Sequence, residues 1–181
     1  MRKGVSAPAA ILLWAGLCAT GSQAVAETQQ CLTRDEASSV VLVVLPEAFK
    51  AFGTACAQAL PPTALLRQTS GPFIEKYQAE ADTAWPMAKA GIAKMAGGDK
   101  TSPFLDSDLM RPMLSAMLAP AITKKLKTKD CPAIDHILTQ FTPLPPRNLT
   151  EVIVSILELV QADDVKAGKK TDIPICTVAK P

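Results

Sequence analysis

The chain has 181 residues, of which 19 are basic, 17 are acidic and one is a histidine, and 48% are hydrophobic. This length suits one compact domain. The near balance of charges argues against a nucleic-acid partner, because proteins that neutralise phosphates usually carry a clear basic excess.

The first 26 residues have the pattern of a secretory signal peptide. Two basic residues precede an apolar run at residues 9–19, and small residues then suit cleavage before Glu27. We therefore expect residues 1–26 to be removed. Residues 27–181 are expected to form a single exported domain, periplasmic or secreted.

The mature chain is expected to be soluble. Cys18 is an alternative attachment point for a lipid, but Leu17 stands where such a site needs a small residue. No later segment offers about eighteen consecutive apolar residues, so we expect no transmembrane helix after cleavage. Loss of the two basic signal residues leaves equal numbers of basic and acidic side chains.

Four cysteines remain after cleavage: Cys31, Cys56, Cys131 and Cys176. An even number of cysteines in an oxidising compartment predicts two disulfides, with three possible pairings. The absence of a C-x-x-C spacing argues against a thioredoxin-type redox site. A zinc site is the weaker alternative for these cysteines.

The densest apolar block of the exported chain begins after a capping-box pair. Thr33 and Glu36 have the spacing at which each side chain accepts a hydrogen bond from the other's backbone N–H. Helical spacing of apolar residues then predicts a helix to about residue 55. A strand at residues 40–45 is the alternative, because these residues are apolar and mostly β-branched. The cap favours the helix, with a kink or brief break expected at Pro46.

A short helical turn is expected at residues 64–66, and helical periodicity returns at residues 73–95. Pro86 is expected to kink or split this second helix. The glycines at 97–98 predict its end.

The next helix is expected from residue 104 or 106 to about residue 126, with interruptions at Pro112 and Pro120. Its end is basic and contains Lys124, Lys125, Lys127 and Lys129. These cations suit the C-terminal end of a helix dipole in water. The alternative is a patch for anionic lipid headgroups.

Two further helices complete the predicted fold. Residues 131–141 form a short helix, and residues 142–146 suit a stiff extended connector. Asn148 and Glu151 then suit the start of an amphipathic helix, before a polar tail from about residue 162. The predicted apolar face of this last helix contains Leu149, Val152, Ile153, Ile156, Leu157 and Val160.

These elements predict an all-α fold, an irregular bundle of four or five proline-kinked helices stapled by two disulfides. A helical path from Cys31 to Cys56 spans roughly 35 Å, which is beyond disulfide reach. Two long helices then return the chain to the Cys56 end at Cys131. We therefore favour Cys56–Cys131 with Cys31–Cys176. Cys31–Cys131 with Cys56–Cys176 comes next, and Cys31–Cys56 with Cys131–Cys176 requires a sharp fold at Pro46.

Catalytic motifs are not found. The single histidine, His136, follows Asp135, and adjacent helical residues point in different directions and do not form an orienting pair. The acids Asp99, Asp106 and Asp108 do not have the spacing of a twelve-residue calcium loop. We therefore expect no enzyme activity, no resident metal and no cofactor.

Met110, Met113 and Met117 are the main functional candidates, because spacings of three and four place them on one helical face. They are typical of an irregular core, of an adaptable wall around an apolar ligand or partner, or of a soft Cu(I) site. The sequence predicts an exported binding or structural-interaction module. Its expected partner is a protein or an apolar small molecule, and a lipid-like carrier is the alternative.

Overall fold

The computed structural model describes residues 31–96, 107, 109–124, 126–171 and 173–176. Several predictions therefore lie outside the described residues. They concern the signal peptide and its cleavage before Glu27, Cys18, the glycine stop at 97–98 and the start of the third long helix. The candidate calcium acids Asp99, Asp106 and Asp108, and Lys125, also lie there.

The described residues form helices, and the predicted all-α class is confirmed. The one β-type pairing among them is an isolated parallel bridge between Leu32 and Ile175. The α-helices are α1 (Arg34–Ala55), α2 (Pro72–Met95), α4 (Met110–Thr123), α5 (Cys131–Phe141) and α6 (Pro146–Lys166). Two short 3₁₀ turns connect them, η1 (Leu65–Arg67) and η3 (Thr128–Asp130).

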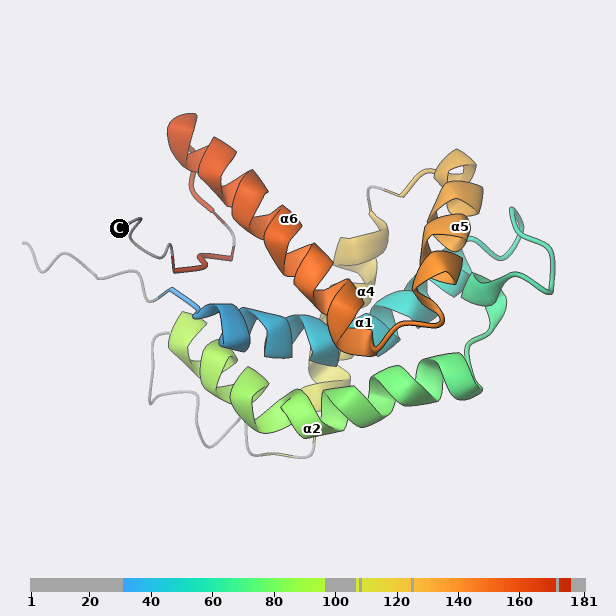
Figure 1. The fold of residues 1–181 in the computed structure, drawn as a ribbon, viewed down its shortest axis with the longest axis horizontal. Helices are drawn as coiled ribbons and strands as arrows, with labels where there is room; N and C mark the ends of the chain where they lie inside the picture. The colour runs from blue at the N-terminus through green and yellow to red at the C-terminus, as the bar shows by residue number, and fades with distance from the viewer. Residues whose placement is uncertain (1–30, 97–106, 108, 125, 172, 177–181) are drawn as a thin grey trace, which may run out of the picture.

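Helix α1 is the central element, and it contacts α2, α4 and α6 (Figure 1). Its predicted capping box is confirmed. The Thr33 hydroxyl accepts from the Glu36 backbone N–H at 3.2 Å, and the Glu36 carboxylate accepts from the Thr33 N–H at 2.7 Å. The helix continues through Pro46 without the interruption we considered. Among the described residues, only α1 is long and apolar enough to cross a membrane, a test that core helices also pass.

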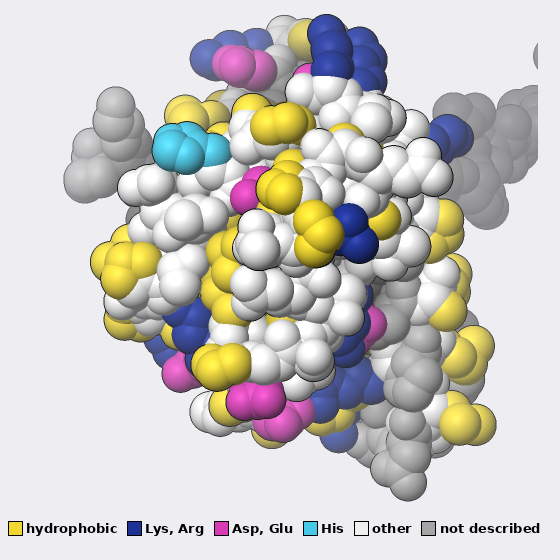
Figure 2. All heavy atoms as spheres, turned by 90° about the vertical axis from the view of Figure 1, so that its right-hand side faces the viewer, with side chains coloured by type: hydrophobic (Ala, Val, Ile, Leu, Met, Phe, Trp, Pro, Cys, Tyr) yellow, Lys and Arg dark blue, Asp and Glu magenta, His cyan; other side chains and the backbone are white. Residues whose placement is uncertain are grey.

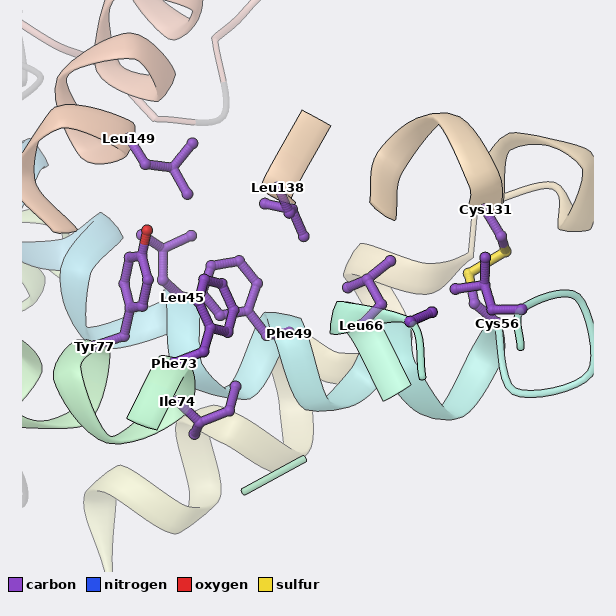
Figure 3. Close-up of a cluster of buried hydrophobic side chains, with 12 residues drawn as sticks. Leu45, Phe49, Cys56, Leu66, Phe73, Ile74, Tyr77, Cys131, Leu138 and Leu149 are labelled. Atoms are coloured by element: carbon purple, nitrogen blue, oxygen red, sulfur yellow. A yellow bond between two sulfur atoms is a disulfide. The ribbon is translucent and has the colours of Figure 1, made fainter. Parts of the chain in front are cut away.

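The main core lies where α1, α2, α5 and α6 meet (Figure 3). Phe49 of α1 packs against Phe73 and Tyr77 of α2, with ring centroids 4.9 to 5.2 Å apart. Leu138 of α5 and Leu149 of α6 cover these rings from the other side. Aromatic clusters of this geometry contribute beyond their buried area, and this one joins helices that are distant in the sequence.

Helix α1 and η1 approach each other too closely for any side chain at position 53. A Cβ atom on Gly53 would lie 2.1 Å from the carbonyl oxygen of Leu66. On the other side of η1, Asp135 accepts a hydrogen bond from the Leu66 N–H at 2.8 Å. The turn is therefore held between α1 and α5.

The favoured disulfide pairing is confirmed. Cys56 at the end of α1 is joined to Cys131 at the start of α5, and Cys31 is joined to Cys176. The second bridge brings the two ends of the described chain together. There the Gln161 side chain exchanges two hydrogen bonds of 2.7 Å with the backbone of Ile175.

The start and the buried face of α6 differ from the prediction. The helix begins at Pro146 with Pro145 as its N-cap residue, so Asn148 lies inside the helix and Pro146 is not part of a connector. It also continues to Lys166, beyond the predicted start of the tail. Proline suits the first turn of a helix because it lacks an N–H that would be unsatisfied there.

The apolar face of α6 is only partly buried. Leu149 and Val154 are buried, whereas the predicted core positions Val152, Ile156 and Val160 are exposed. Helix α6 therefore has apolar residues on more than one side, and only the side that meets α1 enters the core.

Candidate functional site

The described residues contain no group of three or more histidine, cysteine or acidic side chains that would suit a metal ion. All four cysteines that the structure describes are in disulfides, which excludes the zinc alternative for their thiols. His136 is exposed on α5, while the neighbouring Asp135 binds the backbone of η1. The structural role of Asp135 had no signal in the sequence.

Helix α4 is oriented by its first turn. Met110 is buried, with 8% of its surface exposed. Arg111 forms an ion pair with Asp82 of α2 and stacks over the Trp85 ring, with its guanidinium carbon 5.7 Å from the ring centroid. Arg111 therefore holds its side of α4 against α2, and Met110 is covered at the start of the helix.

The outward side of α4 carries an apolar stripe. Leu109, Met113 and Met117 are spaced at i, i+4 and i+8 and are 70%, 45% and 70% exposed. We call these three residues the α4 stripe. Spacing alone had grouped Met110 with the other two methionines and had missed Leu109. A search for every apolar residue at this period would have found it.

This arrangement separates the alternatives for the methionines. Met110 fills the interior, as the core interpretation expected, but Met113 and Met117 do not. A surface Cu(I) site would have only two of the three thioethers that the sequence suggested, because Met110 is buried. An adaptable wall for an apolar partner suits the two remaining methionines, since methionine is flexible and polarizable.

A basic region follows the α4 stripe. Lys124 is the C-cap residue of α4, and Lys127 and Lys129 flank the start of η3. All three side chains are exposed, and none of their ammonium groups forms a hydrogen bond or ion pair with a described residue. Between them, Leu126 packs against the main core, which fixes this segment on the protein.

Helix α6 carries a second exposed apolar stripe. Unlike the segment that carries the α4 stripe, this helix contains more acids than bases. The members of the second stripe are Val152, Ile156, Leu159 and Val160, and we call them the α6 stripe. Four acids lie in this helix, Glu151, Glu158, Asp163 and Asp164, against two bases. Glu151 and Glu158 bind Arg34 of α1, which fastens the helix to the core.

The end of the molecule that carries α5 has no comparable stripe. Figure 2 shows that face, where hydrophobic side chains are scattered among polar ones and do not gather in one patch. Scattered apolar side chains of this kind are usual on protein surfaces.

Several titratable groups near α2 have shifted pKa values that are explained by packing. Burial lowers the pKa of Lys76, whose ammonium donates to the carbonyl oxygens of Thr142 and Leu144. Burial raises the pKa of Tyr77 to about 12. Lys76 links α2 to the segment after α5, and the Tyr77 ring packs in the main core. Both residues belong to α2, and neither is part of the α4 stripe.

No family model, curated protein or solved structure matches this chain. The two disulfides are consistent with an exported protein, because such bonds persist in oxidising compartments.

Proposed function

We propose that this protein is an exported, non-enzymatic binding module that uses the α4 stripe to contact an apolar partner surface. The observation that carries the proposal is the exposure of Leu109, Met113 and Met117 along one side of a helix whose other side is anchored. Contiguous apolar residues on a surface are typical of interaction sites. Methionine thioethers adapt to partners of differing shape.

The proposed location is the periplasm or the secreted fraction. The N-terminal sequence has the charge, apolar run and small residues of a signal peptide, and the mature domain is closed by two disulfides. A rigid, cross-linked helical body is suited to presenting a fixed surface outside the cytoplasm.

Methionine oxidation tests whether a partner covers the stripe. Purified protein and intact cell envelopes are treated with hydrogen peroxide, and the sulfoxide content of each methionine is measured by mass spectrometry. Met87 on α2 is the internal control, because its 47% exposure is close to the 45% of Met113. We expect Met113 and Met117 to be oxidised more slowly in the envelope than in pure protein, with Met87 unchanged. Equal oxidation of all three in both samples would contradict the proposal.

Cu(I) binding is the weaker alternative for the same surface. Only Met113 and Met117 of the three candidate methionines are exposed, and the described residues around them supply no histidine or cysteine cluster. Competition with a chromogenic Cu(I) chelator distinguishes the two functions. Tight Cu(I) binding that disappears when both exposed methionines are changed to leucine would favour the metal.

A further inference from the structure

We infer that the partner of the α4 stripe is an anionic lipid surface, on which α4 lies with its axis parallel to the membrane. This inference rests on the binding role proposed above and names the partner by its chemistry. Three features support it. The segment from residue 109 to residue 129 is basic, its lysines continue the line of the α4 stripe, and both the lysines and the stripe are attached to the core.

The segment that carries the stripe is strongly and uniformly basic. Between residues 109 and 129 the sequence contains no acid, and its bases are Arg111, Lys124, Lys125, Lys127 and Lys129. The chain as a whole is nearly neutral, so this concentration of one sign is local. A helix with an apolar face and several lysines is typical of segments that lie in a membrane interface.

The basic region continues the same face of the helix. Lys124 follows Met117 by seven residues, which is two helical turns, and its backbone is still helical. Leu109, Met113, Met117 and Lys124 therefore form one line along α4. Apolar side chains can enter the acyl boundary while the lysine ammonium groups remain at the level of the headgroups.

The lysines are available to a partner because the protein does not use them. The ammonium groups of Lys124, Lys127 and Lys129 make no hydrogen bond or ion pair with the described residues. Leu126 is packed in the core between them, and η3 leads directly to the Cys56–Cys131 bridge. The cations are therefore held beside the stripe without being neutralised.

The α6 stripe shows why charge decides between the two apolar surfaces. It exposes four apolar side chains, but its helix contains four acids and two bases. Its acids are paired with bases: Glu151 and Glu158 with Arg34, and Asp163 with Lys166. An anionic surface would therefore attract it much less than the basic segment of α4, whose described lysines have unpaired ammonium groups. The α6 stripe thus provides a control of similar apolar character in a helix without a basic excess.

Vesicle flotation tests the inference with the mature, disulfide-bonded protein. The wild type is mixed with vesicles of phosphatidylcholine alone or with phosphatidylglycerol added. We expect binding to the anionic vesicles only, and we expect it to weaken as sodium chloride is raised, because exposed charges are screened. If the anionic vesicles protect Met113 and Met117 from peroxide while Met87 still reacts, the membrane contact lies on the α4 stripe.

Charge variants locate the electrostatic contribution. The triple change Lys124→Glu, Lys127→Glu, Lys129→Glu is expected to weaken binding by about a hundredfold or more, since each basic residue near an anionic surface contributes about fivefold. The control is Lys166→Glu, Lys169→Glu, Lys170→Glu, which changes the net charge equally at the other end of the molecule. It should retain most of the binding. Equal loss in both triple variants would overturn the inference.

Apolar variants locate the insertion. Leu109→Gln with Met117→Gln is expected to weaken vesicle binding about tenfold per side chain, whereas Ile156→Gln with Leu159→Gln on the α6 stripe should not. All four positions are exposed, so circular dichroism should show folded proteins. Absence of wild-type binding to anionic vesicles, or equal binding to neutral ones, would refute the lipid inference.

The two proposals fail in different ways. Protection of Met113 and Met117 in cell envelopes without vesicle binding would refute the lipid partner but keep the binding role, and would indicate an acidic protein surface instead. Absence of protection in envelopes, together with absence of vesicle binding, would refute both.

Discussion

At the scale of single residues, the least expected feature is the Tyr77 hydroxyl. It is fully buried, points toward Leu149 and has no hydrogen-bond partner in the structure (Figure 3). A buried polar group without a partner destabilises the folded state, and the raised pKa of Tyr77 has the same origin, loss of water around the charged form.

Tyr77→Phe is therefore expected to leave the free energy of unfolding unchanged or to raise it by about 1 kcal/mol. The ring keeps its contacts with Phe49 and Phe73. Urea denaturation with the disulfides intact measures the change. Phe73→Leu is the control, because it removes ring volume from the same cluster and should destabilise the protein by about 1 kcal/mol or more. A clear loss in Tyr77→Phe would mean that the hydroxyl is bonded in solution.

Glu36 makes stability depend on pH. Burial raises the pKa of this carboxyl, but hydrogen bonds from Lys94 and Thr33 outweigh it, and the pKa lies below its ordinary value of 4.5. Because the folded pKa is lowered, the ionised carboxylate stabilises the protein above the unfolded pKa. That contribution is lost as the pH falls below 4.5 and through the folded pKa.

Glu36→Gln keeps an acceptor for the cap but removes the charge that pairs with Lys94. We expect a loss of about 1 kcal/mol at neutral pH and a smaller decline in stability upon acidification than in the wild type. Urea denaturation at several pH values measures both. Glu47→Gln is the control, since Glu47 pairs only with the neighbouring Lys50 at the surface. An unchanged pH dependence in Glu36→Gln would contradict this assignment.

At the scale of elements, the contact between α1 and η1 leaves no room for a side chain at position 53. Gly53→Ala would place a methyl group 2.1 Å from the Leu66 carbonyl oxygen, and Leu66 is held from the other side by Asp135. Alanine favours a helix by about 1 kcal/mol over glycine. The backbone displacement nevertheless leaves an expected net loss of about 1–3 kcal/mol.

Gly91→Ala is the matched control for this prediction. Its new Cβ would lie 3.2 Å from the Leu32 side chain and 3.3 Å from the Glu36 Cβ, so these neighbours need to shift by only a few tenths of an ångström. Thermal denaturation of both variants should show a lower midpoint for Gly53→Ala than for Gly91→Ala. The reverse order would show that η1 is free to move.

At the scale of the whole molecule, the two disulfides connect elements that are far apart in the sequence. Cys56–Cys131 spans 75 residues and Cys31–Cys176 spans 145. Closing long loops restricts the unfolded chain, and loss of a native disulfide from a small exported domain typically costs 2–5 kcal/mol. In our proposal the Cys56–Cys131 bridge also contributes to binding, because it fixes the basic region that precedes α5.

Cys56→Ser with Cys131→Ser is therefore expected to lower the free energy of unfolding by about 2–5 kcal/mol. It should also weaken binding to anionic vesicles, since Leu126 and η3 lose their covalent anchor. Denaturation and vesicle flotation measure the two effects. Cys31→Ser with Cys176→Ser should lower stability by a similar amount but leave vesicle binding largely intact. Equal vesicle binding by both variants would show that the bridge does not position the lysines.

Local sequence signals were sufficient where neighbouring residues determine the structure. The Thr33–Glu36 cap and the short turn at η1 depend on residues that are close together in the sequence, and both were predicted. The cysteine pairing was also correctly predicted: helix length places Cys31 and Cys56 out of reach of each other, and the return of the chain through two long helices favours Cys131 as the partner of Cys56. The start of α6 was wrong because two start signals lay three residues apart, and proline at the first position prevailed over Asn148.

The sequence by itself determined the helical class, most helix boundaries, the disulfide pairing and the basic character of the segment after α4. Tertiary structure alone decided which apolar residues face inward. Met110 and Met117 are both apolar and lie two turns apart on α4, yet one is buried and the other is 70% exposed. The physical reason is that periodicity defines faces of a helix, but burial depends on where neighbouring helices end. Arg111 in the first turn of α4 pairs with Asp82 of α2, and Met110 beside it is covered, while Met117, farther along the same helix, remains open to a partner.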